Sequence, residues 1–445
     1  MNSNAELAIV GAGPAGTLLA LLAARRGIQV ALFERRADPR SSAPAAGRSI
    51  NLALAARGMR ALDAAGMLPA LRPLLVPMHG RQLHLADGGE SFSAYGQMAG
   101  ETNYAISRVD LARLLVEAAG QEPRIRLHFR RRCVGFAASG RVLLQDEDTG
   151  QHHELDTPRV IGADGAGSAL RKAMAQAGEV AASNELLDHD YKELAIPAVN
   201  GASALAVREA LHIWPRRGCM LIALPNADHS FTATLFLPRT GAPSFAALAR
   251  PEDARGFFAR EFPDALARMP DFDREIAAHP QGVLGTVRCA PWNLGERLLL
   301  IGDAAHAIVP FHGQGMNCAL EDCVLLDALL ADGRPGPFAR FSAARRADTD
   351  AIAAMSLENY GEMRAAVLDP RFQRQRELEL QLERRHPRRF VPRYAMVMFH
   401  PEIPYSMALQ RGRVQQQILD ELEQYGAPDS LLADRLVRER LDELP

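Results

Sequence analysis

The sequence predicts an α/β fold that combines a Rossmann-like dinucleotide-binding domain, an interleaved β-sheet domain and a helical C-terminal region. Three observations predict it. A glycine-rich turn joins an apolar, strand-like run to a helix-like run within residues 7–26. Strand-rich stretches punctuated by turn residues occupy 76–104 and 176–292. The last third has helical patterns over 316–364, 372–388 and 406–443.

These patterns divide the chain into three regions. The dinucleotide-binding domain is expected to be discontinuous, with its parts at 1–75, 105–175 and 293–340. The β-sheet domain, which we expect to bind substrate, consists of 76–104 and 176–292. The helical region then covers 341–445.

The composition is that of an ordinary globular protein, with 445 residues, 48% hydrophobic, 23% charged and a net charge of −2. This charge provides no basic field for nucleic acid or an anionic membrane. Five scattered cysteines without a CxxC pair favour reduced thiols in the cytoplasm, and predict neither disulfides nor a metal site. Residues 7–24 approach the length of a membrane span, but the glycines and proline in their middle favour a buried strand and helix.

The first predicted unit is a strand at 7–10, a glycine turn, a helix at 17–26 and a second strand at 28–33. The turn contains a G-x-G-x-x-G motif formed by Gly11, Gly13 and Gly16. Such glycines allow a tight turn, close backbone approach to a pyrophosphate and close packing of the helix on the strand. The helix N-terminus offers unpaired N–H groups to phosphate. Glu34, after the second strand, can accept a hydrogen bond from a ribose hydroxyl.

Two further nucleotide-type motifs lie far downstream, "GADGAGSALR" at 162–171 and "IGDAAH" at 301–306. There is no second G-x-G-x-x-G and no CxxxxC pair, so neither a separate NAD(P)H domain nor a redox disulfide is expected. Three separated motifs in this order resemble the FAD-dependent aromatic hydroxylases. The resemblance implies that "GADGAGSALR" serves both FAD and a transient NADPH, and that Asp303 binds the ribityl or pyrophosphate part of FAD.

The loop "FHGQGMN" at 311–317 is expected to run alongside the flavin ring. Its glycines allow close approach, and the helix that follows presents the N–H groups of Met316 and Asn317 to the negative charge of a reduced flavin. Phe311 and His312 are expected to form the wall on the substrate side of the ring. His312 could be a catalytic base, but a pocket-lining, hydrogen-bonding histidine is favoured.

The stretch 80–97 predicts a hairpin around Asp87-Gly88-Gly89. Arg81 shares a face with two leucines, where a guanidinium needs a carboxylate partner. A three-residue loop would place Arg81 directly opposite Tyr95, and a two-residue loop would put them on opposite faces. We favour the former. The alternative is that Arg81 lies at the solvated end of an exposed hairpin.

A second hairpin, 220–226 and 230–238, offers apolar walls for an aromatic substrate through Ile222, Leu224 and Phe236, although ordinary sheet packing would use the same residues. In the helical region, Asn359, Glu362 and Met363 share one helix face that could receive an ammonium and a carboxylate. Tyr394 could supply a hydroxyl to a carboxylate.

A more specific resemblance rests on longer motifs. They are "GRSINLALAARG" at 47–58, "DYKEL" at 190–194, "HIWPR" at 212–216, "GDAAHAIVPFHGQGMNCALEDC" at 302–323, "ENYGEMR" at 358–364 and "RYAMVMFHPEIPY" at 393–405. Together they resemble the kynurenine 3-monooxygenases. The charged end "RLVRERLDELP" is similar to the soluble bacterial type rather than to the membrane-anchored eukaryotic one.

The resemblance implies an FAD enzyme that uses NADPH and O2 to hydroxylate L-kynurenine to 3-hydroxy-L-kynurenine through a flavin C4a-hydroperoxide, in tryptophan degradation. It implies that the amino-acid end of the substrate is held by Arg81, Tyr95, Asn359 and Tyr394. The residues expected at FAD are Gly11, Gly13, Ala15, Gly16, Glu34, Arg35, Arg108, Asp303, Gly315, Met316 and Asn317.

Two alternatives stay open on the sequence. One is an aromatic hydroxylase acting on a phenol or an anthranilate-like acid, and the other is a flavin oxidase, which would need no NADPH. Neither a nucleic-acid partner nor a membrane is expected. A homodimer is compatible with the sequence but not required by it.

Overall fold

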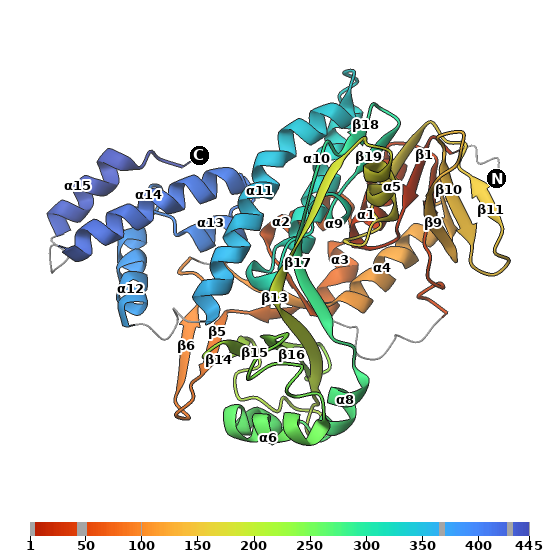
Figure 1. The fold of residues 1–445 in the computed structure, drawn as a ribbon. Helices are drawn as coiled ribbons and strands as arrows, with labels where there is room; N and C mark the ends of the chain where they lie inside the picture. Colours follow the sequence, from red (N-terminus) through yellow and green to blue (C-terminus); the bar gives the residue numbers. More distant parts are fainter. Residues whose placement is uncertain (1–4, 42–50, 99, 365–369, 425–429, 445) are drawn as a thin grey trace.

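In the computed structural model, the chain forms two large β-sheets and a group of C-terminal helices (Figure 1). The structure describes residues 5–41, 51–98, 100–364, 370–424 and 430–444. The first four residues of the "GRSINLALAARG" motif therefore lie outside the described residues. The arrangement confirms the predicted α/β fold class with a helical C-terminal region.

The dinucleotide-binding sheet is assembled from distant parts of the chain. Its strands, in spatial order, are β18 (Asn293–Leu294), β19 (Leu298–Leu300), β12 (Arg159–Gly162), β1 (Leu7–Val10), β2 (Val30–Phe33) and β8 (Ile125–His128). All neighbours are parallel except β18 and β19. Strands β1 and β2 are buried throughout, as their short apolar runs predict.

Helices pack around this sheet and follow several of its strands. Helix α1 (Pro14–Arg25) packs against α4 (Arg108–Gln121) and α10 (Gly315–Ala331). A short helix, α9 (Asp303–His306), follows β19 directly. Helix α5 (Ala169–Gln176) packs against β9 of a small sheet formed by β9 (Arg131–Phe136), β10 (Val142–Asp146) and β11 (His152–Glu154).

The second large sheet has the spatial order β17 (Gly282–Ala290), β13 (Ala181–Ile196), β16 (Phe231–Pro238), β15 (Cys219–Pro225), β14 (Leu211–Arg216), β5 (Gly80–His84) and β6 (Glu90–Ala94). Helices α6 (Pro251–Glu261), α7 (Pro263–Leu266) and α8 (Phe272–Ala278) lie beside it (Figure 1). Their phenylalanines form a separate apolar core with β13, β15 and β16. The hairpin at 80–94 and the strands of the 176–292 segment thus share one sheet, and the domain boundaries themselves stay a prediction.

A third, smaller sheet has three strands. It pairs β7 (Asn103–Ser107) with β3 (Asn51–Leu54) on one side and β4 (Val76–Met78) on the other. Helices α2 (Ala56–Ala64) and α3 (Leu68–Leu71) and a 3₁₀ turn, η1 (Arg72–Leu74), connect β3 to β4.

The register of the first hairpin differs from the predicted one. Arg81 pairs with Ser93, and His84 pairs with Glu90, so the three loop residues are 86–88 instead of 87–89. The prediction that Arg81 lies directly opposite Tyr95 is therefore wrong. Because the shift is by two residues on the facing strand, both side chains still point to the same face.

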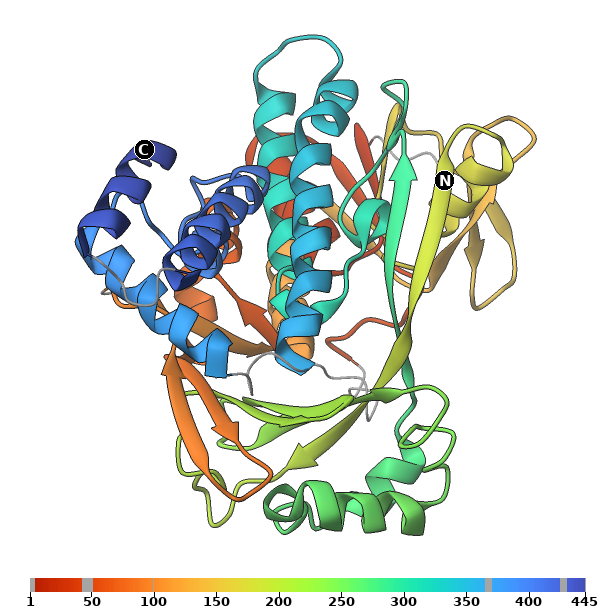
Figure 2. The same ribbon diagram turned by 60° about the vertical axis from the view of Figure 1, so that its left-hand side comes forward.

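The C-terminal third consists of α11 (Pro337–Arg364), α12 (Pro370–Arg385), α13 (Arg393–Phe399), α14 (Tyr405–Gln424) and α15 (Ser430–Arg440). Figure 2 shows α12 close to the β5–β6 hairpin, where Gln97 Nε2 donates to Leu380 O at 3.0 Å. Among the helices that the structure describes, none combines the length and apolarity needed to cross a membrane.

Candidate active site

One cavity of about 630 Å³ joins the two large sheets and the helical region. Most of the residues singled out from the sequence line it: Gly11, Gly13, Ala15, Glu34, Arg35, Arg81, Tyr95, Arg108, Ile222, Leu224, Phe236, Asp303, Phe311, His312, Gly315, Met316 and Tyr394. Gly16, Asn317, Asn359 and Glu362 are not among its lining residues. The side chain of Met363 lies outside the described part of the structure.

The dinucleotide end of the cavity is the turn between β1 and α1. Gly11 has φ +106°, and a Cβ there would lie 2.3 Å from Ala163 O. A Cβ on Gly16 would lie 2.0 Å from Gly11 O, so this glycine permits close packing of helix on strand and does not contact the cavity. Gly13 has open space around its Cβ position. Gly11 and Gly16 thus lie where a side chain would clash with the backbone, and the approach of a pyrophosphate at Gly13 stays a prediction.

Acidic and basic side chains surround this turn. Glu34 accepts a hydrogen bond from Ala12 N at 3.1 Å, which holds its carboxylate beside the turn. Arg35, Arg108 and Asp303 also face the cavity. Asp164 accepts from Ala169 N at 2.7 Å through Oδ2, while its buried Oδ1 has no protein partner. Open backbone at a helix N-terminus, cationic side chains and carboxylates make a donor and acceptor set that fits FAD.

Arg171, at the end of the "GADGAGSALR" motif, holds two of the separated motifs together. It is buried, and its guanidinium donates to Ala304 O at 2.7 Å and to Ala166 O. Ala304 lies in α9, next to Asp303. The arginine therefore fixes the position of Asp303 relative to the strand β12 loop.

The loop after α9 runs through a 3₁₀ turn, η2 (Pro310–His312), and enters α10 at Gly315. Met316 and Asn317 consequently lie in the first turn of that helix. The Asn317 side chain points away from the cavity: its amide accepts from Ala55 N at 2.9 Å and donates to Ala53 O at 2.9 Å and Gly313 O at 2.8 Å. It attaches the loop to β3.

The opposite end of the cavity is aromatic and contains one buried cation. The Arg81 guanidinium lies 5.7 Å from the ring centre of Tyr95 and 4.8 Å from that of Tyr394. The two tyrosine rings stack at 5.5 Å, and Tyr394 also stacks on His312 at 5.6 Å. Arg81 Nε is buried without a hydrogen-bond partner. A buried cation with an unused donor is suited to an anionic ligand group.

The apolar walls come from the second hairpin and the loop. In β15 and β16, Ile222 pairs with Thr234 and Leu224 with Thr232. Phe236 contacts Phe311 with ring centres 5.1 Å apart. Phe311 O accepts a hydrogen bond from Asn359 Nδ2 at 2.5 Å, so this asparagine supports the wall from behind.

His312 is buried and its Nδ1 has no hydrogen-bond partner. Burial, with smaller effects of Arg393 and Arg81, lowers the pKa of His312 to about 3. The imidazole is therefore neutral at physiological pH and a weak base. This supports the pocket-lining role over the role of catalytic base.

Thr234, which the alternation places on the same face as Phe236, also lines the cavity. Several other lining residues were not predicted: Met78, Asn103, Tyr191, Leu211, Met220 and Met398. Met220 follows from strand alternation with Ile222 and Leu224. Asn103 had no sequence signal. Its Nδ2 donates to the Tyr394 hydroxyl at 3.3 Å. Glu362 pairs with Arg393 at 3.0 Å, close to this end of the site.

The fold and the cavity define a flavoprotein of the aromatic hydroxylase type with a single dinucleotide-binding fold. A family model described as "FAD binding domain" matches residues 4–336. Two solved structures resemble the chain at 20% identity. One is the tetrameric form of 2-methyl-3-hydroxypyridine-5-carboxylic acid oxygenase (TM-score 0.67, covering 83% of this chain and 95% of that one). The other is pqsL, a probable FAD-dependent monooxygenase from Pseudomonas aeruginosa (TM-score 0.64, 81% and 97%).

Relatives of known name are much more similar. A kynurenine 3-monooxygenase of Xanthomonas euvesicatoria pv. vesicatoria is 50% identical over 420 residues, covering 94% of this chain and 92% of that protein. A kynurenine 3-monooxygenase of Stenotrophomonas maltophilia is 47% identical over 422 residues, with the same coverage. The chain belongs to the kynurenine 3-monooxygenase family of FAD-dependent monooxygenases, which confirms the resemblance seen in its motifs.

Proposed function

We propose that this protein uses FAD, NADPH and O2 to hydroxylate L-kynurenine to 3-hydroxy-L-kynurenine. The observation that carries the proposal is the buried Arg81 between Tyr95 and Tyr394, at the end of an apolar cavity that continues into the dinucleotide site. The names of the relatives support the same substrate.

The substrate has a zwitterionic amino-acid end and an aromatic amine end. The buried cation and the tyrosines of the cavity suit the first, and its apolar walls suit the second. Arg81 and the hydroxyls of Tyr95 and Tyr394 receive the carboxylate, because a charge-assisted hydrogen bond to a buried guanidinium is strong. Glu362, already beside Arg393, is the nearest proposed partner for the ammonium group. Asn359, bonded to Phe311 O, holds the loop on which the ring rests.

The aromatic ring packs between Ile222, Leu224, Phe236 and Phe311, and this packing excludes water from the reacting carbon. FAD, when bound, would supply the redox chemistry: the two electrons come from NADPH, one oxygen atom of O2 enters the ring, and the other leaves as water. The amino group of the substrate already donates electrons to the ring. A neutral His312 is therefore compatible with the reaction, because no strong protein base is required.

We also propose a cytoplasmic location, which the five unpaired and buried cysteines support. A homodimer stays a prediction from the sequence.

The test is a steady-state assay of the FAD-loaded protein with NADPH and L-kynurenine, followed by identification of the product. The expected result is substrate-stimulated NADPH oxidation with a matching amount of 3-hydroxykynurenine. Hydroxylation of a phenol or an anthranilate-like acid in preference to kynurenine would establish the first alternative. Oxidation that proceeds without NADPH would establish an oxidase.

A further inference from the structure

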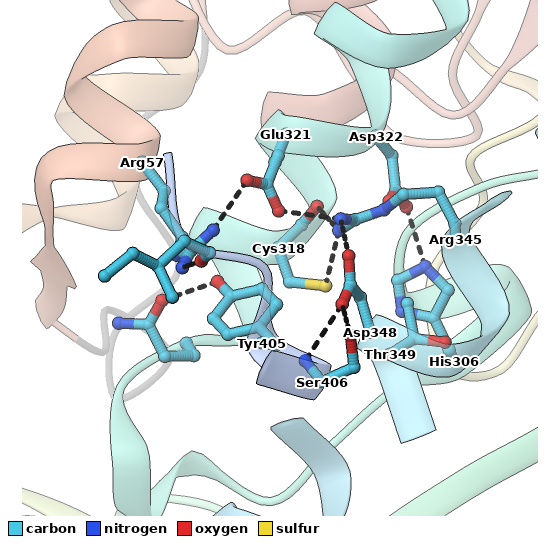
Figure 3. A network of polar contacts seen from close by, with 12 residues as sticks. Arg57, His306, Cys318, Glu321, Asp322, Arg345, Asp348, Thr349, Tyr405 and Ser406 are labelled. Carbon is cyan, nitrogen blue, oxygen red and sulfur yellow. Dashed lines mark hydrogen bonds and ion pairs between the residues drawn. The ribbon is translucent and has the colours of Figure 1, made fainter. Parts of the chain in front are cut away.

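A network of charged side chains, most of them buried, links α10 to α11 and to the segment around α13, and none of these side chains lines the cavity (Figure 3). Its first member is Asp322, which is fully buried. Its Oδ2 accepts hydrogen bonds from Gly302 N at 3.0 Å and from His306 Nε2 at 2.7 Å. These two residues flank and end α9. A single carboxylate oxygen therefore fixes both ends of the turn that carries Asp303.

The second member is Arg345 of α11, also buried. Its Nε donates to Asp322 Oδ1 at 2.8 Å and its Nη1 to Glu321 Oε2 at 2.7 Å. Its Nη2 lies 3.2 Å from Cys318 Sγ. His306, Cys318 and Asp322 are of metal-ligand type and have their ligand atoms within 4.8 Å of one another. The guanidinium already supplies the positive charge of this cluster, so it does not need a metal ion.

The third link joins this pair to the C-terminal helices. Glu321 Oε1 accepts from Arg57 Nη1 at 2.8 Å. Arg57 is buried, donates to Val397 O at 3.1 Å and to His400 O at 3.3 Å, and stacks on the Tyr405 ring at 3.9 Å. Val397 lies in α13.

Helix α13 also carries Tyr394 and Met398, both of which line the cavity. The buried charges therefore run from the turn with Asp303 to the helix with Tyr394. Asp303 and Tyr394 line the cavity, whereas the four charged residues that connect them, Asp322, Arg345, Glu321 and Arg57, do not.

We propose that Asp322, Arg345, Glu321 and Arg57 are positioning residues that set the flavin-binding turn and the substrate-binding helix in register with each other. This inference deepens the proposed function, since it assigns Asp303 to FAD and Tyr394 to the substrate. Arg57, Asp322 and Arg345 are buried and Glu321 is partly exposed, so the removal of one partner leaves a buried charge uncompensated, and the attached turn or helix moves. A shift of about 1 Å in a positioned group is enough to lower binding or rate by up to roughly a hundredfold.

The two halves of the chain can be tested separately. Asp322→Asn weakens the hold on α9, and we expect the Kd of FAD, titrated into apoprotein by flavin fluorescence, to rise at least about tenfold. Glu321→Gln leaves Asp322 bonded to Gly302, His306 and Arg345 but weakens the link to Arg57. We expect it to leave the Kd of FAD within about twofold while raising that of L-kynurenine at least about fivefold.

Arg340→Gln is the matched control. Arg340, like Arg345, is an arginine of α11 that pairs with an acidic residue of α10. Its partner is Asp332, at 2.6 Å, which caps the C-terminal end of α10, at the opposite end of that helix from the flavin loop. It should lower the melting temperature without changing either Kd. The proposal is wrong if Asp322→Asn and Glu321→Gln also lower only the melting temperature, or if both raise the two Kd values by equal factors.

Hydrogen–deuterium exchange gives a readout that requires no substrate. Glu321→Gln should accelerate exchange of the α13 amides at 393–399, and Arg340→Gln should not. If wild-type protein fails to bind kynurenine, the proposed function is wrong, whereas the FAD titration and the exchange still decide the positioning role. If Asp322→Asn does not fold, Glu321 is the decisive position, because its side chain is partly exposed and its glutamine variant is isosteric. Unchanged α13 exchange in Glu321→Gln would then refute the proposal.

Discussion

The buried guanidinium of Arg81 allows a sharp test of substrate binding. The change is Arg81→Met, which keeps a long, unbranched side chain and removes the charge. In the free protein, Arg81 Nε has no hydrogen-bond partner and the guanidinium lies between two tyrosine rings. In the free state the change removes cation–π contacts, of the order of 0.5–2 kcal/mol, and the interactions of the guanidinium with the hydroxyls of Tyr95 and Tyr394. Folding and FAD affinity should be retained.

In the complex, the same change removes a charge-assisted hydrogen bond to the substrate carboxylate. Such a bond contributes about 1.5–3 kcal/mol, which corresponds to a rise in Kd of roughly ten- to hundredfold. The assay is a titration of the FAD-loaded protein with L-kynurenine and, in parallel, with its decarboxylated analogue, which keeps the aromatic amine and the ketone. Wild type should prefer kynurenine by about the same factor, and the variant should lose this preference.

The comparison of the two ligands separates a carboxylate contact from a general disturbance of the pocket. A disturbance would weaken both ligands equally. If the variant binds kynurenine as tightly as wild type does, Arg81 is not in the substrate site. If it still prefers kynurenine to the analogue, the carboxylate is bound elsewhere.

Three further predictions address the remaining parts of the site. Tyr394→Phe keeps the stacked ring and loses the hydroxyl, so KM for kynurenine should rise about three- to tenfold with kcat within about twofold; a loss of kcat alone would give the hydroxyl a different role. Gly11→Ala would place a Cβ 2.3 Å from Ala163 O at φ +106°, so FAD affinity should fall at least about tenfold in a flavin titration, and unchanged affinity would contradict the close approach. The pKa of His312 is about 3 in the folded protein, below its ordinary value of 6.5, so below pH 6.5 the unfolded chain binds one more proton and the folded state loses stability as the pH falls toward 3. At about pH 4.5 this residue costs the folded state on the order of 2–3 kcal/mol, and denaturation at about pH 7 and about pH 4.5 should show His312→Gln losing less stability than wild type by that amount; equal losses would refute the neutral, buried imidazole.

The sequence was sufficient to predict those parts of the site that depend on a pattern of a few neighbouring residues. The G-x-G-x-x-G turn, the strands around it and the "IGDAAH" loop are such patterns, because a phosphate or a flavin must meet particular backbone geometry within a few residues. Strand alternation likewise predicted Ile222 and Phe236 on the cavity wall. Arg81 and Tyr394 were proposed from the hairpin pattern and from the hydroxyl of the tyrosine, the family resemblance implied the same two residues, and the structure places them together.

The sequence was insufficient to predict strand register and side-chain contacts that depend on the whole fold. Its hairpin register was shifted by two residues, because turn residues at 87–89 permit more than one loop placement. Asn317 was expected to present its backbone N–H to the flavin, which stays a prediction, but no local pattern predicted that its side chain would bond to Ala53 and Ala55. No local pattern predicted that Asn103 would lie in the site and donate to the Tyr394 hydroxyl.

By itself, then, the sequence determined the fold class, the three dinucleotide motifs and the family. Only the tertiary structure decided which side chains face one another across distant segments, such as Arg57 and Glu321, which are 264 residues apart. The physical reason is that a motif is recognised through backbone geometry encoded over a few neighbouring residues. A buried ion pair instead depends on how separate helices pack, and that packing is set by the whole chain at once.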